Sequence, residues 1–142
     1  MKELLQKVQA VMQDFIGHTN RMKQGEIVSP YEINVVGREM IAVHWEIAQE
    51  KGRMFNAKEK AHIDRKVSTT KFFMDERVKE ECKSAKDAEV SATALSADKL
   101  YEEVDKLSDY ETMKEIQRSL DRAIEQNRST LSLMKLHEKE AQ

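Results

Sequence analysis

The feature that most constrains the fold of this chain is its scarcity of helix-breaking residues. Pro30 is the only proline and no glycine follows Gly52, so residues 53–142 contain neither. Proline removes a helical hydrogen bond, and glycine costs about 1 kcal/mol relative to alanine inside a helix. Apolar residues make up only 39% of the chain, which is typical of long helices that each bury one narrow stripe. The sequence therefore predicts an all-α protein.

The first helix is predicted over residues 1–17. Its apolar residues recur every three or four positions, which is the spacing of one helix face. Gly17 is predicted to end the helix, because glycine is common just beyond helix C-termini. The polar stretch 18–29 is then predicted to be a loop.

The clearest helix start lies in the hexapeptide VSPYEI, residues 28–33. Ser29 can cap a helix, Pro30 suits the first turn, and Glu32 stands where a capping box requires it. Val28 and Ile33 have the spacing of a hydrophobic staple. We therefore predict that a long helix begins at Pro30.

A heptad pattern follows this start and then changes register. The first register comprises apolar residues that step by three, four or seven: Ile33, Val36, Met40, Val43, Ile47 and Met54. The second register comprises Ile63, Val67, Thr70 and Met74. The nine residues from Met54 to Ile63 fit no heptad. We therefore predict either one long helix over 30–83 that is bent at 52–56, or two helices that meet there.

A small, polar tract at 84–97 is predicted to hold a turn, and residues 98–140 are predicted to form the return helix. The whole chain, 1–142, is then a single helical domain: a long antiparallel, coiled-coil-like hairpin with a short N-terminal helix. A hairpin of this length leaves apolar area uncovered, so we predict a homo-oligomer. A polar residue in a seam, here Asn127, often sets register or oligomeric state. The predicted oligomer seam comprises Met40, Val43, Ile47, Ile124, Asn127 and Leu131.

Charge is spread unevenly along a chain whose net charge is −2. Residues 51–71 carry seven Lys or Arg and two acids, a net of +5. Residues 72–117 carry seven Lys or Arg and thirteen acids, a net of −6. Opposite charges in neighbouring segments indicate either a surface for a partner or two helices that attract each other.

The basic segment 51–71 contains the candidate binding site. At about 100° per residue, its cations form a stripe with Phe55 in the same arc, and two further phenylalanines follow directly. Cations neutralise phosphates and aromatic rings stack on bases, so the pattern is typical of binding to single-stranded nucleic acid. A solvated, charged helix face is the alternative. The candidate residues are Lys51, Lys58, Lys60, Arg65, Lys66, Lys71, Phe55, Phe72 and Phe73.

No motif in the chain indicates an enzyme. The sequence has no glycine-rich phosphate loop and no HExxH, and no two of its four histidines are four residues apart, so we predict no catalytic site, metal or cofactor. Cys82 is the only cysteine, which excludes an internal disulfide and agrees with a cytoplasmic protein. No apolar run approaches the roughly 20 residues of a membrane span, so we predict no membrane partner.

Three tracts resemble the recombination mediator family of T-even phages: KEKAHIDRKV at 58–67, TALSADKLYEEVDK at 93–106, and AIEQNRSTLSLMKLHEKEA at 123–141. The resemblance extends over roughly residues 31–140. It implies a ring-like, viral homo-oligomer that binds single-stranded DNA and helps load a recombinase onto DNA coated by single-strand-binding protein. It also implies that the cations which contact DNA are Lys58, Lys60, Arg65 and Lys66.

Two other functions fit the same sequence. One is an adaptor or inhibitor module that binds a protein through the acidic segment 72–117 or through its methionine-rich seams. The other is a structural coiled coil for assembly, in which Asn127 sets the register and the charges serve only solubility.

Overall fold

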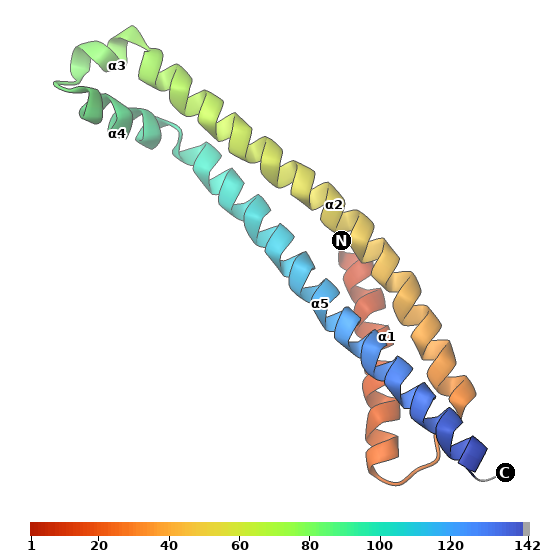
Figure 1. Ribbon diagram of the computed structural model, residues 1–142. Helices are drawn as coiled ribbons and strands as arrows, with labels where there is room; N and C mark the ends of the chain where they lie inside the picture. The colour runs from red at the N-terminus through yellow and green to blue at the C-terminus, as the bar shows by residue number, and fades with distance from the viewer. Residues whose placement is uncertain (141–142) are drawn as a thin grey trace. The chain divides into compact units, whose positions relative to one another are not determined.

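The computed structural model describes residues 1–140, and nearly all of them are helical (Figure 1). The helices are α1 (Lys2–Lys23), α2 (Pro30–Met74), α3 (Glu76–Glu81), α4 (Ala85–Leu95) and α5 (Ala97–Glu140). The part of the chain that the structure describes contains no strand. The all-α prediction is therefore confirmed.

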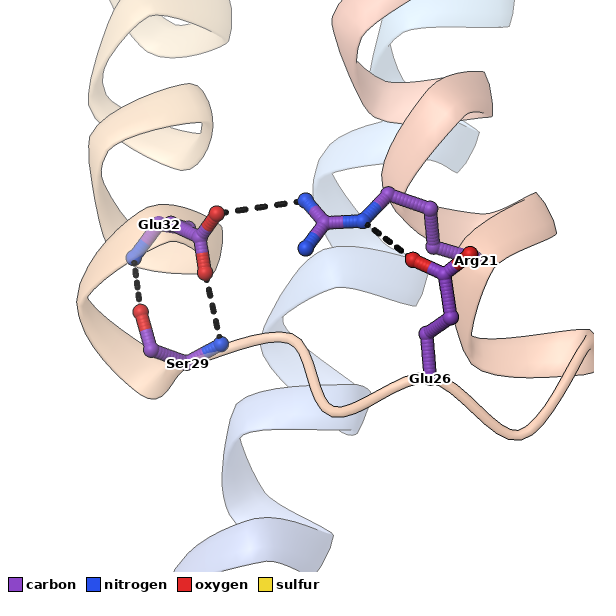
Figure 2. Close-up of polar contacts among 4 residues, drawn as sticks. All are labelled: Arg21, Glu26, Ser29 and Glu32. Atoms are coloured by element: carbon purple, nitrogen blue, oxygen red, sulfur yellow. Dashed lines mark hydrogen bonds and ion pairs between the residues drawn. The ribbon is translucent and has the colours of Figure 1, made fainter.

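Helix α2 begins where the sequence predicts, at a complete capping box (Figure 2). The Glu32 amide donates to the Ser29 hydroxyl at 3.2 Å, and the Ser29 amide donates to the Glu32 carboxylate at 2.8 Å. Arg21 donates to both Glu32, at 3.2 Å, and Glu26, at 3.0 Å. Two backbone donors at the helix start thus find side-chain acceptors, and the arginine ties the preceding loop to this start.

Helix α1 is longer than predicted, because Gly17 lies inside it rather than at its end. The chain turns instead at Gly25, whose φ of 81° is left-handed and so favours glycine. The Glu26 amide donates to the Arg21 carbonyl at 3.0 Å, and the Gly25 amide donates to the Met22 carbonyl at 3.1 Å. This pair of bonds forms a Schellman motif. The predicted loop 18–29 is therefore only the short segment 24–29.

Helix α2 ends at Met74, nine residues before the predicted end at residue 83, and it is helical throughout the predicted bend at 52–56. Asp75 stops it by capping α3, since its carboxylate accepts from the Arg77 amide at 2.9 Å. Ser84 then caps α4 by accepting from the Asp87 amide at 3.1 Å. The predicted turn 84–97 is therefore mostly a helix, because its many alanines favour helix once a serine caps it.

Packing within the chain defines two compact units. Unit 1 comprises residues 1–50 and 113–142, and so contains α1, the first part of α2 and the last part of α5. Its core is large and takes buried apolar side chains from all three helices, among them Val11, Met40, Ile47, Met113 and Leu120.

Unit 2 comprises residues 51–112, with the rest of α2, helices α3 and α4, and the first part of α5. Its buried apolar side chains are few and mostly small: Met54, Ala61, Val78, Ala88 and Ala92. Several large apolar side chains of unit 2 remain exposed. Unit 2 therefore buries much less apolar area than unit 1.

The predicted oligomer seam lies in unit 1 and is covered within one chain. Met40, Val43, Ile47, Ile124 and Asn127 are buried, and Leu131 is half-buried. Because α1 and the two long helices already enclose these side chains, they stabilise the fold of a single chain. A contact between copies therefore has to use other residues.

Candidate functional site

The candidate binding site lies in unit 2, where the long helix α2 carries all nine predicted residues. The structure places these residues on different sides of the helix. Two of the cations are engaged with α5 or with aromatic rings, and three are exposed.

Arg65 turns toward α5 and pairs with Glu103, whose other carboxylate oxygen lies 2.6 Å from His62 Nδ1. The side chains of Arg65 and Glu103 are only 27% and 18% exposed. The hydrogen bond with His62 holds the pKa of Glu103 below its usual value, partial burial opposes this, and Arg65 adds to the lowering. This part of the basic segment therefore attracts the acidic segment of the same chain, one of the two interpretations that the sequence left open.

Lys58 is likewise held within the chain. Its ammonium forms an ion pair with Glu59 at 3.0 Å and lies 4.9 Å from the ring centre of Phe55 and 5.2 Å from that of Tyr110. The two rings contact each other at a tilt of 59°, with centres 5.8 Å apart. Lys58 and Phe55 thus form a cation–π cluster with α5, and a nucleic acid would have to displace these contacts to use them.

The exposed cations of the predicted set are Lys60, Lys66 and Lys71, while Lys51 is half-buried. At 100° per residue, Lys60 and Lys71 lie within about 20° of each other, and Lys66 lies about 120° or more around the helix from both. The accessible positive charge of α2 therefore forms two edges rather than one stripe.

The predicted aromatic residues do not come together. Phe72 and Phe73 are half-buried near the end of α2, and Phe55 lies seventeen residues earlier, about 25 Å away along a helix. Phe73 lines a hollow of about 610 Å³ with Thr69, Thr70, Ala85, Lys86 and Glu89. Phe55 contacts the predicted cation Lys58, whereas Phe72 and Phe73 follow Lys71 at the end of α2.

An exposed apolar stripe separates the two cationic edges, and the sequence interpretation missed it. The second heptad register lies at the surface: Ile63, Val67 and Met74 are 56%, 47% and 61% exposed. The reason is that His62 and Arg65 bond to Glu103 of α5, and Thr69 bonds to Ser96 in the turn between α4 and α5. Ile63, Val67, Thr70 and Met74, here called the α2 stripe, lie on the other side of the helix.

Three further observations on the described residues concern metal ligands, a second hollow and membrane-spanning helices. Within residues 1–140, His, Cys, Asp and Glu side chains nowhere gather in a group of three that could hold a metal ion. A hollow of about 270 Å³ opens beside Lys58, Glu59, His62, Glu103 and Leu107. No helix of the described chain combines the length and apolar character that crossing a membrane requires.

Comparison with known proteins gives no match: no family model, curated protein or solved structure resembles the chain significantly.

Proposed function

We propose that the protein is a non-enzymatic accessory protein of DNA recombination, of viral origin and acting in the host cytoplasm. In this proposal its hairpin of α2 and α5 self-associates and binds single-stranded DNA, and the assembly helps a recombinase to replace single-strand-binding protein. The proposal rests on the three tracts that resemble the T-even phage mediator family, and on the exposed lysines of α2.

The single observation that carries DNA binding is the exposure of Lys60, Lys66 and Lys71 on α2 of unit 2. Ammonium groups in water release counterions when they meet phosphates, which drives binding without reading sequence. Arg65 and Lys58 contribute less, because their charges are already paired within the chain. The phosphate-contacting set is therefore revised to these three lysines, and Phe55 remains the candidate for base stacking.

The test is fluorescence anisotropy of a labelled poly-dT oligonucleotide with the full-length chain, at low and high salt. Three phosphate contacts per chain predict a log–log salt slope of about −2, so affinity should fall about forty-fold from roughly 50 to 300 mM salt. Lys60→Glu with Lys66→Glu should remove binding. Lys79→Glu with Lys83→Glu makes the same charge change at exposed positions outside α2 and should leave most binding intact. Absence of binding at low salt by the folded wild type would refute the proposal.

A protein-binding module is the second candidate, favoured by the exposed α2 stripe. Exposed apolar residues at heptad spacing on a packed helix are typical of a surface that another helix covers. This candidate gains if the protein binds no DNA at low salt but a Val67→Glu variant loses a partner that co-purifies with the wild type.

A further inference from the structure

Helix α2 carries a second row of heptad-spaced residues in unit 1, here called the outer row, on the side of the helix that faces solvent. Its members follow one another at steps of three and four: the exposed Tyr31, Asn34, Arg38, Ile41 and Trp45 and the half-buried Ala48. At about 100° per residue, the centre of this row lies about 150° around the helix from the centre of the buried seam, which comprises Ile33, Val36, Met40, Val43 and Ile47. The outer row therefore points away from the core of unit 1.

Two aromatic rings and an arginine give the outer row its character. The side chains of Tyr31 and Trp45 are 77% and 66% exposed, although tryptophan is largely buried in most folded proteins. Arg38 lies midway between them, seven residues from each, which is about 10.5 Å along a helix. No residue that the structure describes forms an ion pair with Arg38. The row thus presents two exposed rings on either side of an unpaired guanidinium.

Carboxylates lie away from the outer row. Each acid of α2 in unit 1 lies about 110° or more around the helix from the centre of the row: Glu32, Glu39, Glu46 and Glu50. On the side of α2 that faces α5, Asp121 approaches His44 at 2.8 Å, about 90° from the centre of the row. The charge of Arg38 therefore has no carboxylate of α2 beside it, and the outer row suits an anionic partner.

We propose that the outer row is a further contact for single-stranded DNA, in which Tyr31 and Trp45 stack on bases and Arg38 binds a phosphate between them. Aromatic faces beside a cation are how proteins bind single strands without reading their sequence. A partner helix fits less well, because it would bury Asn34 and the unpaired Arg38 at the centre of its seam, which is costly. The inference rests on the proposed DNA binding, and adds a site in unit 1 to the lysines of unit 2.

The chain's only tryptophan, Trp45, reports on this contact. The experiment is a titration of the full-length chain with poly-dT at low salt, followed by tryptophan fluorescence and, in parallel, by anisotropy of the labelled strand. A base that stacks on the indole quenches its emission, so both signals should follow the same binding curve. Trp45→Ala should weaken binding about fivefold or more, the lower end of what one stacked base contributes. Trp45→Phe keeps a ring and should lose less.

Arg38→Gln tests the phosphate contact. With Arg38 as a fourth cation, the log–log salt slope of the wild type should be about −3 rather than −2, and the variant should return it to about −2. Arg122→Gln is the matched control, because Arg122 is exposed on α5 in unit 1, outside the outer row. This control should keep the affinity and the salt slope of the wild type. Circular dichroism should show unchanged helix content in all these variants, because the replaced side chains are exposed on helices.

The same measurements separate this inference from the proposed function. If the wild type binds poly-dT without quenching and Trp45→Ala binds equally well, the outer row does not contact the strand, although DNA binding stands. If quenching and the loss in Trp45→Ala are both seen but Lys60→Glu with Lys66→Glu still binds, the outer row is supported and the lysine set is wrong. A wild type that binds no poly-dT at low salt refutes both.

A protein partner on the outer row would give a different result. Trp45→Ala would then lower the mean mass of the protein in light scattering while its affinity for poly-dT stayed that of the wild type. That outcome would identify the outer row as a contact between protein chains and would overturn the inference.

Discussion

Asn127 of α5 donates a hydrogen bond of 3.0 Å to the backbone carbonyl of Ile33 in α2, and both residues are buried. Gly37, one turn farther along α2, makes the space for this side chain, because a Cβ there would lie 2.5 Å from Asn127 Nδ2. The polar seam residue thus joins two helices of the same chain in unit 1. Its amide is satisfied at one register only, which gives the seam a specificity that apolar side chains alone lack.

Gly37→Ala should destabilise the protein, although alanine is the better helix former. The added methyl group either stays too close to Asn127 or pushes the amide away from the Ile33 carbonyl, which then loses a buried hydrogen bond. Overpacking of this kind costs about 1–3 kcal/mol, and helix propensity returns up to about 1 kcal/mol. We expect a net loss of about 1–2 kcal/mol in the free energy of unfolding by urea.

Gly52→Ala is the matched control, since Gly52 also lies within α2 but a Cβ there would meet nothing within 4 Å. This variant should be more stable than the wild type by about 0.5–1 kcal/mol. If the two variants change stability in the same direction, the close approach of Gly37 to Asn127 is not what matters.

Glu32→Gln should reveal how much the capping box depends on a charged carboxylate. The Ser29 backbone amide, with help from the Ser29 hydroxyl and Arg21, lowers the pKa of Glu32 from 4.5 to about 2. A pKa that is lowered by folding stabilises the folded state above the unfolded value, and this stabilisation disappears as the pH falls through the folded value. The wild type should therefore exceed the variant in melting temperature at pH 5–7, and the difference should vanish between pH 4.5 and about 2.

Glu125→Gln is the control for this pH dependence, because Glu125 is an exposed carboxylate in the middle of α5. It makes the same change of charge away from any helix start. A difference between wild type and Glu32→Gln that persists unchanged at pH 2 would show that the charge of Glu32 is not what stabilises the cap.

The sequence predicted those parts of the fold that depend on neighbours a few residues apart. Ser29 and Glu32 are three residues apart, so their capping box could be recognised without knowing what surrounds it. Gly17 and Gly25 look equivalent in the sequence, and only the φ of Gly25 shows which of them turns the chain. Asp75 was missed as a cap because no Glu or Gln stands three residues after it.

The candidate site was harder to predict because it depends on which side of α2 faces α5. Helical periodicity places Arg65 and Lys66 in neighbouring positions, yet Glu103 pairs with one and leaves the other exposed. The same rotation leaves Ile63 and Val67 of the second heptad register exposed. Pairing between residues about forty positions apart sets this rotation, and one sequence does not show it.

Ser84→Ala should loosen the start of α4. The serine hydroxyl accepts from the Asp87 amide at 3.1 Å and donates to the Asp87 carboxylate at 2.8 Å. Loss of an N-cap costs about 1 kcal/mol, and faster amide hydrogen exchange should appear first at residues 85–88. Ser119→Ala is the control, because Ser119 lies within α5 and its hydroxyl donates back to the Glu115 carbonyl of the same helix, at 3.0 Å. The rate of amide hydrogen exchange around residue 119 should stay the same or fall in this variant.

Glu103→Gln should destabilise unit 2, because it leaves the Arg65 guanidinium facing a neutral amide in a partly buried position. Hydrogen bonds to charged groups contribute about 1.5–3 kcal/mol, and exposure of the pair at 27% and 18% reduces the expected loss to about 1–2 kcal/mol. Because folding lowers the pKa of Glu103, this stabilisation is present above the usual carboxylate pKa and disappears as the pH falls through the folded value.

A double-mutant cycle with Arg65→Gln isolates the ion pair from the loss of side-chain packing. If Arg65 and Glu103 act on each other, Arg65→Gln should cost much less free energy of unfolding in the Glu103→Gln background than in the wild type at pH 7. The coupling should disappear as the pH falls through the folded pKa of Glu103, which lies below the usual carboxylate value. Additive losses at pH 7 would mean that the two side chains stabilise α2 independently, and that the basic segment is not held by its acidic neighbour.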